Sequence, residues 1–120
     1  MNKDIKVLLA DDSAFMRKVL KDILGDAGFS QFIECGNGKE CLEKYESEKP
    51  ELLLLDIIMP EMSGMEVLKK IGFMSNVIII SAMGQSEMMN DAKKYGAKGY
   101  IVKPFDRKKV IDEIENVLGK

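Results

Sequence analysis

The feature that most constrains this chain is a fivefold alternation of short apolar runs with segments of helical periodicity. Runs of strand length occupy residues 5–10, 31–35, 51–56, 76–81 and 99–102. Each is followed by a segment whose apolar residues recur every three or four positions, as on one face of a helix. These segments are marked by residues 16–27, 41–45, 65–71, 88–95 and 110–118. The alternation predicts parallel βαβ units with right-handed crossovers, arranged as a compact (βα)5 layered sandwich.

The strands differ in composition, and this predicts their places in the sheet. The run 51–56 is the most apolar, so we expect it to be the central strand, covered on both faces. The run 31–35 is less apolar and suits a sheet edge. Gly28 is expected to end the first helix, and the second should end before Pro50.

Length and charge bound the class of protein. The 120 residues fit one domain, which we expect to span residues 1–120. A net charge of -2 without a basic cluster argues against a nucleic-acid partner. Unbroken apolar runs do not exceed four residues, as in 52–55 and 77–80, far short of a membrane span. With no secretory signal pattern at the N-terminus, we expect a cytoplasmic protein without membrane attachment.

The residues available for chemistry are limited. The chain has no histidine, which excludes Ser-His-Asp and Cys-His catalysis, histidine-ligated metals and a phosphohistidine of its own. Its two cysteines, Cys35 and Cys41, are expected to be buried free thiols. Carboxylates, lysine, hydroxyls and backbone groups must therefore carry the function.

Polar residues stand at the carboxyl ends of four of the five predicted strands: Asp11-Asp12, Asp56, Ser81 and Lys103. In an open parallel sheet, ligands bind at this edge. Each residue alone also has an ordinary explanation, as a helix cap, a turn residue or a strand-end hydroxyl. Their coincidence at one edge favours a functional site.

The chemistry of this set is coherent. Three carboxylates at one site repel each other unless a cation joins them, and Mg²⁺ is the natural candidate. With the metal bound, one carboxylate can attack phosphorus and form an acyl phosphate. Lys103 would then neutralise phosphoryl oxygens as a mobile point charge.

The chain resembles a known family over nearly its whole length, the response-regulator receiver domains. Among these it is most similar to the stand-alone chemotaxis regulators of the CheY type. The matching segments are LLADDS (8–13), LDIIMPEMSG (55–64), ISA (80–82) and KPF (103–105). The spacing of acidic pair, central aspartate, hydroxyl and Lys-Pro is specific, although no single segment is. The resemblance implies a flavodoxin-like, doubly wound parallel sheet of five strands in the order 2-1-3-4-5.

The resemblance also implies roles for individual residues. Asp56 would accept the phosphoryl group from a CheA-type histidine kinase or a small acyl phosphate. Asp12 and Asp56 would bind Mg²⁺ together with the backbone carbonyl of Ile58, and Asp11 would act largely through water. Lys103 would contact the phosphoryl oxygens.

Further implied roles concern the switch. Pro104 would follow a cis peptide bond that aims Lys103 into the site. Ser81 would move toward the phosphoryl group, and Tyr100 would turn inward behind it. The readout would be the face formed by the fourth helix, fifth strand and fifth helix, with Met88 and Met89 as a candidate adaptable partner surface.

The expected partners follow from the same resemblance. A kinase would phosphorylate the protein, and a bacterial motor switch protein or an archaeal adaptor would receive the signal. Ile58 and Met83 are apolar where relatives often carry polar groups that assist water, so we expect slow to moderate dephosphorylation and a separate phosphatase. We expect a monomer.

Several alternatives remain open or are disfavoured. A phosphorelay shuttle and a receiver cut from a transcription factor remain open. A flavodoxin-like FMN carrier is disfavoured because Asp11-Asp12 would repel a phosphate that lacks a metal, and the glycine motifs of dinucleotide enzymes and nucleotide hydrolases are absent. Aspartyl-phosphate hydrolases carry an acid/base aspartate where this chain has Ile58. We therefore expect a switch that catalyses only its own phosphorylation and dephosphorylation.

Overall fold

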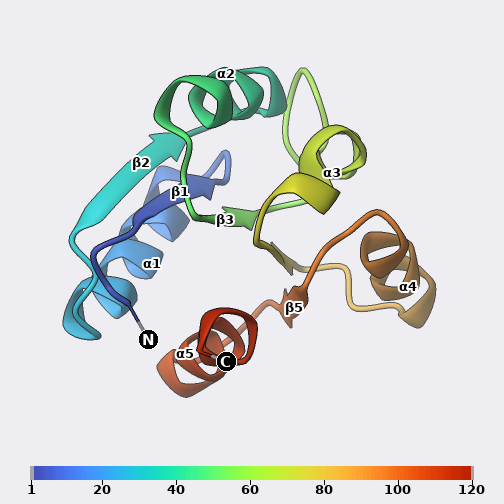
Figure 1. The fold of residues 1–120 in the computed structure, drawn as a ribbon. Helices are drawn as coiled ribbons and strands as arrows, with labels where there is room; N and C mark the ends of the chain where they lie inside the picture. Colours follow the sequence, from blue (N-terminus) through green and yellow to red (C-terminus); the bar gives the residue numbers. More distant parts are fainter. Residues whose placement is uncertain (1, 120) are drawn as a thin grey trace.

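The computed structural model describes residues 2–119, in which five strands and five α-helices alternate (Figure 1). The elements in chain order are β1 (Lys6–Ala10), α1 (Ala14–Asp26), β2 (Gln31–Cys35), α2 (Gly38–Glu48), β3 (Leu52–Leu55), α3 (Gly64–Ile71), the 3-10 turn η1 (Gly72–Met74), β4 (Val77–Ser81), α4 (Ser86–Lys94), β5 (Gly99–Val102) and α5 (Arg107–Leu118). All ten predicted elements are therefore present.

The five strands form one parallel sheet in the order β2-β1-β3-β4-β5. The predicted flavodoxin-like fold and strand order are confirmed. β3 occupies the centre and all four of its leucines are buried, whereas β2 lies at an edge and is only partly buried. Apolarity predicted both positions because a central strand of such a sheet is covered on both faces by helices.

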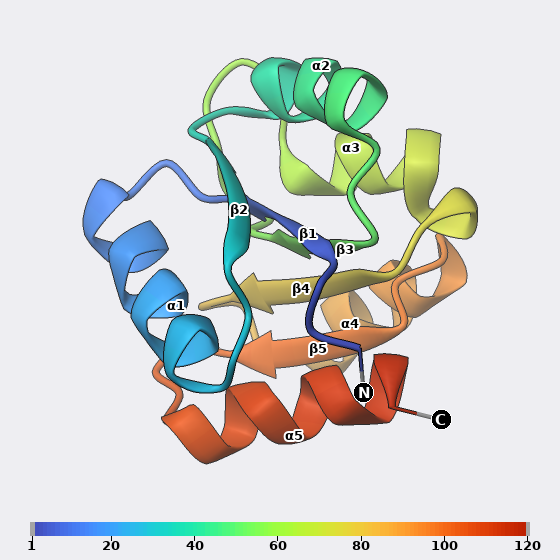
Figure 2. The ribbon, with the colours of Figure 1, turned by 60° about the vertical axis from the view of Figure 1, so that its left-hand side comes forward.

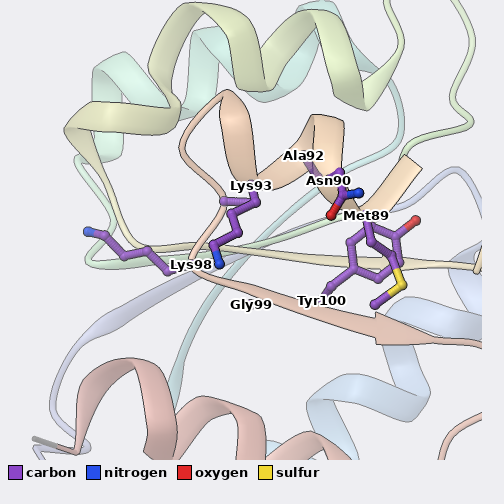
Figure 3. A pocket seen from close by; sticks show the side chains of 8 residues that line it. Met89, Asn90, Ala92, Lys93, Lys98, Gly99 and Tyr100 are labelled. Carbon is purple, nitrogen blue, oxygen red and sulfur yellow. The ribbon is translucent and has the colours of Figure 1, made fainter. Parts of the chain in front are cut away.

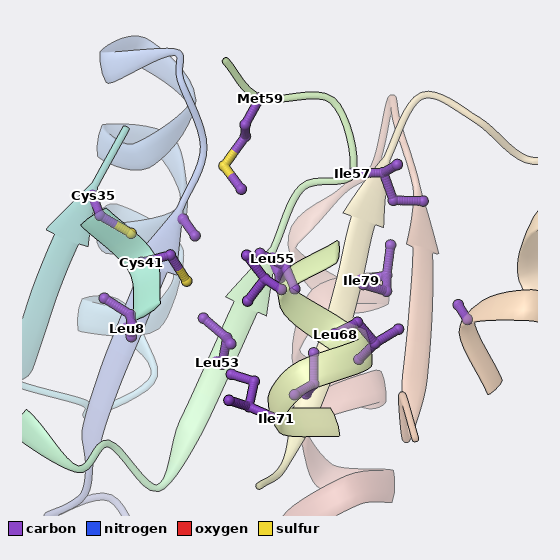
Figure 4. Close-up of a cluster of buried hydrophobic side chains, with 14 residues drawn as sticks. Leu8, Cys35, Cys41, Leu53, Leu55, Ile57, Met59, Leu68, Ile71 and Ile79 are labelled. Carbon is purple, nitrogen blue, oxygen red and sulfur yellow. The ribbon is translucent and has the colours of Figure 1, made fainter. Parts of the chain in front are cut away.

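Two helical layers sandwich the sheet (Figures 1 and 2). α1 and α5 cover one face, where Leu20, Leu24 and Ile114 pack against residues such as Leu9 and Leu54. α2, α3 and α4 cover the other face, which carries a second cluster of buried side chains that includes both cysteines (Figure 4). Alternate residues of each strand point to opposite layers, so one strand supplies both cores.

The helices begin where side chains satisfy their first backbone N–H groups. The hydroxyl of Ser13 accepts a hydrogen bond from the amide of Met16 at 3.1 Å and starts α1. Ser63 and Glu66 form a reciprocal capping box at the start of α3. A cap of this kind stabilises a helix by about 1 kcal/mol. Both caps lie in loops that follow the strand ends β1 and β3, and they fix the entry of the chain into its helices.

Gly64 brings α3 close to the end of β3. A Cβ atom at this position would lie 1.9 Å from the backbone oxygen of Asp56, a distance that no side chain can occupy. The amide of Gly64 also donates a 2.7 Å hydrogen bond to the carbonyl of Ile57. Glycine is therefore required here, because the backbones of the loop and the helix must touch.

The predicted boundaries differ from the observed ones by a few residues. The observed strand β3, Leu52–Leu55, is one residue shorter at each end than the predicted strand 51–56, so Asp56 lies just beyond it. η1 follows α3 directly and was not predicted, because a single 3-10 turn leaves no periodic pattern. Cys35 and Cys41 are buried free thiols with no disulfide between them, as predicted. Within residues 2–119, no helix is both long enough and apolar enough to cross a bilayer.

Candidate phosphoacceptor and metal site

The parallel sheet gathers the predicted residues at one edge. Ala10 pairs with Leu55, so Asp11 and Asp56 follow neighbouring strand ends. The amide of Asp56 donates a 2.9 Å hydrogen bond to the carbonyl of Ala10 and continues the ladder beyond β3. Residues that are 45 positions apart in the chain thus present their side chains on the same side of the sheet.

The other half of the sheet adds a hydroxyl and a cation to this edge. Ser81 is the last residue of β4, and its side chain is fully buried. The amide of Lys103 donates to the carbonyl of Ser81 at 2.9 Å, so Lys103 follows β5 just as Asp56 follows β3. The Lys103–Pro104 peptide bond is cis.

Lys103 joins the two buried carboxylates. Its ammonium nitrogen lies 3.0 Å from Oδ2 of Asp11 and 3.0 Å from Oδ2 of Asp56. The carboxylate side chains are only 4% and 9% exposed, and that of Lys103 is 19% exposed. Charge-assisted hydrogen bonds in such a protected place are stronger than surface ion pairs.

A third carboxylate completes the cluster. One oxygen from each of Asp11, Asp12 and Asp56 can be chosen so that all three lie within 4.8 Å of one another. Asp12 is exposed, and its carboxylate makes no hydrogen bond to any other residue between positions 2 and 119. Three carboxylates therefore face one lysine, which leaves an excess of negative charge at the edge.

The pKa values of the buried groups reflect burial first and neighbouring charges second. Burial raises the pKa of Asp56, and the charge of Asp11 raises it further against the opposing effect of Lys103. Burial lowers the pKa of Lys103, but its hydrogen bonds to Asp11 and Asp56 outweigh this effect and the pKa is raised overall. An additional cation beside Asp56 would lower the cost of ionising this buried carboxyl group.

The donor set fits Mg²⁺ and not a softer metal. The cluster offers only carboxylate oxygens, and Mg²⁺ prefers one or two carboxylates with waters and phosphate oxygens. Neither cysteine belongs to the carboxylate cluster, and the chain has no histidine. The amide of Ile58 donates a 3.3 Å hydrogen bond to Oδ1 of Asp56, so the Ile58 peptide borders the same carboxylate.

Ser81 and Tyr100 meet on the backbone of Met83. The amide of Met83 donates to the hydroxyl oxygen of Ser81 at 3.2 Å, and the Tyr100 hydroxyl donates to the carbonyl of Met83. Burial raises the pKa of the Tyr100 hydroxyl. One residue of backbone therefore connects the hydroxyl in the site with the aromatic ring on β5.

A groove beside Tyr100 lies between α4 and β5 (Figure 3). Its volume is about 300 Å³, and its lining includes Met89, Asn90, Lys93, Lys98 and Tyr100. Met89 is 38% exposed, whereas its neighbour Met88 packs partly against the core. Of the two methionines singled out in the sequence, Met89 thus faces the groove.

Sequence reasoning missed two residues that border the site, Arg17 and Glu34. Arg17 donates from Nη1 to the backbone carbonyl of Asp11 at 2.6 Å and from Nε to Glu34 at 2.8 Å. A signal was present, because long side chains on a helix point back toward its N-terminus and Arg17 lies one turn after Ser13. The carbonyl it contacts cannot be read from a pattern of side chains.

This chain belongs to the response-regulator receiver family: residues 7–115 match the response regulator receiver domain. It is therefore a two-component response regulator, a signalling switch whose receiver domain is of the CheY type. It is 45% identical to the chemotaxis protein CheY of Thermotoga maritima, over 93% of this chain and 96% of that protein. It is 44% identical to CheY of Bacillus subtilis, over 95% of this chain and 98% of that protein.

Solved structures agree with this assignment. The CheY in a CheX-CheY-BeF3-Mg²⁺ complex from Borrelia burgdorferi superposes with a TM-score of 0.91 and is 36% identical. The match covers 96% of this chain and 90% of that chain.

Proposed function

We propose that Asp56 accepts a phosphoryl group from the phosphohistidine of a CheA-type kinase in a Mg²⁺-dependent reaction. The observation that carries this proposal is the arrangement of Asp56 beside Asp11, Asp12 and Lys103 at the carboxyl edge of the sheet. Receiver domains generally bind Mg²⁺, and a cluster with three carboxylates and one lysine suits such an ion.

The reaction is a transfer between two nucleophiles. A carboxylate oxygen of Asp56 bonds to phosphorus while the bond from phosphorus to the donor's imidazole nitrogen breaks. The electron pair of that bond leaves with the imidazole; with acetyl phosphate as donor, it leaves with acetate. Lys103 binds a phosphoryl oxygen, which it reaches from its position beside Oδ2 of Asp56.

Mg²⁺ would be held by Asp12, Asp56 and the backbone carbonyl of Ile58, with Asp11 acting through water. When bound, the ion neutralises charge on the phosphoryl oxygens. The protein residues supply the rest: they fix the nucleophile, exclude solvent from one side and place Lys103. Because Asp56 and Lys103 are already in position, little reorganisation precedes the transfer.

We infer that the switch acts through Met83. A phosphoryl group on Asp56 offers Ser81 a charged acceptor, and Ser81 already accepts from the amide of Met83. Movement of Ser81 shifts this backbone, whose carbonyl accepts from Tyr100. The α4-β5-α5 face and its groove beside Tyr100 would then change their affinity for a partner.

The partner that we propose is a component of a motility system. The CheY relatives that are 44% and 45% identical are chemotaxis proteins, which favours a motor switch protein or an archaeal adaptor over a transcriptional or relay output. The protein would act as a cytoplasmic monomer, with residues 1–120 as one receiver unit.

Signal termination would depend on a separate phosphatase. Ile58 is apolar and 61% exposed beside the acceptor, and Met83 is apolar as well, so neither side chain can orient an attacking water. The Borrelia CheY forms a complex with CheX, BeF3 and Mg²⁺, which supports a separate partner protein for a receiver of this type. A phosphoryl group that decays as fast as in rapidly cleared receivers would contradict this part of the proposal.

The proposal is tested by incubating the protein with acetyl phosphate and measuring the intact mass by mass spectrometry. We expect a mass gain of one phosphoryl group that requires Mg²⁺, is removed by hydroxylamine and is absent in Asp56→Asn. If the folded wild-type protein gains no mass with Mg²⁺ present, the proposed phosphorylation is wrong and the site would serve binding alone.

A further inference from the structure

Arg17 and Glu34 form a bridge beside the carboxylate cluster that takes no part in the reaction described above. Arg17, on α1, donates from Nη1 to the carbonyl oxygen of Asp11 at 2.6 Å. Its Nε atom donates to Oε1 of Glu34, on β2, at 2.8 Å. The arginine side chain is only 18% exposed, so its conformation is restricted by packing as well as by these bonds.

The bridge closes a ring of contacts around the loop after β1. Glu34 precedes Cys35, whose carbonyl accepts from the amide of Asp11 at 3.1 Å. Asp11 is therefore held on both sides of its backbone, through its N–H by β2 and through its C=O by α1. Its carboxylate is bound as well, by the amide of Ser13 at 2.9 Å and by Lys103.

Asp12 has none of these side-chain restraints. Its carboxylate is exposed and makes no hydrogen bond within residues 2–119. The carbonyl of Asp11 and the amide nitrogen of Asp12 belong to the same planar peptide unit. By fixing that carbonyl, Arg17 fixes the plane from which the Cα–Cβ bond of Asp12 extends.

We propose that Arg17, held by Glu34, is a positioning residue for the Asp12 carboxylate in Mg²⁺ binding. This inference rests on the proposed function, because it assumes that the cluster binds Mg²⁺. Arg17 suits the task better than lysine, because its planar guanidinium can serve the carbonyl and Glu34 at the same time. Glu34 also offsets a positive charge that would otherwise repel the metal.

The two effects of Arg17 on Mg²⁺ have opposite signs, which makes the inference testable. As a charge, the guanidinium disfavours a second cation nearby, so its removal should tighten Mg²⁺ binding. As a positioning group it favours binding, so its removal should weaken it. Loss of a residue that orients a metal ligand typically weakens affinity by about 10- to 100-fold.

The experiment is a Mg²⁺ titration of the full chain followed by amide NMR shifts, with unfolding by urea measured in parallel. We expect Arg17→Gln to weaken Mg²⁺ binding by about tenfold. Arg17→Lys keeps the charge but lacks the two separate nitrogens, Nε and Nη1, that make the contacts, so it should fall between this variant and the wild type. Glu34→Gln is a milder change that tests the same bridge if the Arg17→Gln variant does not fold. It should weaken Mg²⁺ binding measurably, but less than Arg17→Gln does.

The matched control is Lys21→Gln. Lys21 lies on the same helix and binds the other oxygen of Glu34 at 3.1 Å. Its replacement removes the same charge but leaves the contact to Asp11 intact, so we expect unchanged or slightly tighter Mg²⁺ binding. Unchanged or tighter binding in a folded Arg17→Gln or Glu34→Gln variant would overturn the positioning role. A wild-type protein that binds no Mg²⁺ would instead overturn the proposed function together with this inference.

Discussion

The ammonium nitrogen of Lys103 lies 3.0 Å from Oδ2 of Asp56, although 47 positions separate the two residues in the chain. It lies equally near Asp11, so one lysine compensates two carboxylates that are almost completely buried. Without it, none of the three carboxylates would have an ion-pair partner among residues 2–119.

Replacement of Lys103 should therefore destabilise the protein, and Mg²⁺ should offset the loss. We expect Lys103→Gln to lower the free energy of unfolding by about 1–3 kcal/mol in EDTA, as for a charged hydrogen-bonded group that keeps some contact with water. With saturating Mg²⁺ the loss should be smaller, because the metal supplies the missing charge. Urea unfolding of both proteins with and without Mg²⁺ measures this difference, and an equal loss in both conditions would contradict it.

Mg²⁺ should stabilise the wild-type protein in proportion to its binding. At a concentration of 100 times the dissociation constant we expect a gain of about 2.7 kcal/mol in the free energy of unfolding. Asp12→Asn should lose most of this gain, because it removes a proposed Mg²⁺ ligand whose carboxylate makes no hydrogen bond within residues 2–119. Asp22→Asn, which removes a carboxylate that pairs with Lys18 on the exposed side of α1, should keep the gain. A full gain in Asp12→Asn would argue that Asp12 is no ligand.

The close approach at Gly64 should make it intolerant of substitution. Gly64→Ala would place a Cβ atom against the backbone of Asp56, and we expect a loss of about 3 kcal/mol in the free energy of unfolding. A Cβ atom added at Gly25, within α1, would meet no neighbouring group within 4 Å, so Gly25→Ala should stabilise the protein by about 0.5–1 kcal/mol. Urea unfolding of both variants measures these changes. Changes of the same sign in the free energy of unfolding would contradict this account.

The Glu34–Arg17 ion pair should make stability depend on pH. The hydrogen bond from Arg17 lowers the pKa of Glu34 in the folded protein. The stabilisation is thus fully present above the ordinary glutamate pKa of about 4.3, and it is lost as the pH falls through the lowered value. Because Glu34 is partly exposed, Glu34→Gln should cost less than about 1 kcal/mol at pH 7.

The measurement for this pair is urea unfolding of wild type and Glu34→Gln from pH 3 to pH 7. The difference between them should shrink as the pH falls. Glu43→Gln, on the exposed side of α2, removes the same charge without touching Arg17 and serves as the control. A difference that grows toward low pH would contradict the assigned direction.

The sequence was a good guide to the elements and to the residues at the strand ends, and there is a physical reason for both. Apolar periodicity reports burial, and parallel strands necessarily bring residues such as Asp11 and Asp56 to one edge. Contacts between a side chain and a distant backbone group leave no such pattern. The bond from Arg17 to the Asp11 carbonyl and the bond from Tyr100 to Met83 therefore emerged only from the structure.

The roles of the three aspartates depend on the surroundings of each carboxylate more than on the fold that brings them together. The strand order is confirmed and the carboxylates of Asp11, Asp12 and Asp56 lie together, but the three are chemically identical groups. What distinguishes them is environment: the Asp11 carboxylate is held by Ser13 and Lys103, that of Asp12 is exposed and makes no hydrogen bond within residues 2–119, and Asp56 is buried with a raised pKa beside Lys103. The central claim is that this environment makes Asp56 the phosphoacceptor.

The most direct test is to locate the phosphoryl group by borohydride reduction. The protein is treated with acetyl phosphate and Mg²⁺ and then reduced, which converts a phosphorylated aspartate into homoserine. Peptide mass spectrometry identifies the altered position. We predict homoserine at position 56 alone, and none when Mg²⁺ is omitted. Homoserine at position 11 or 12, or unaltered peptides from a folded protein with Mg²⁺ present, would contradict the account.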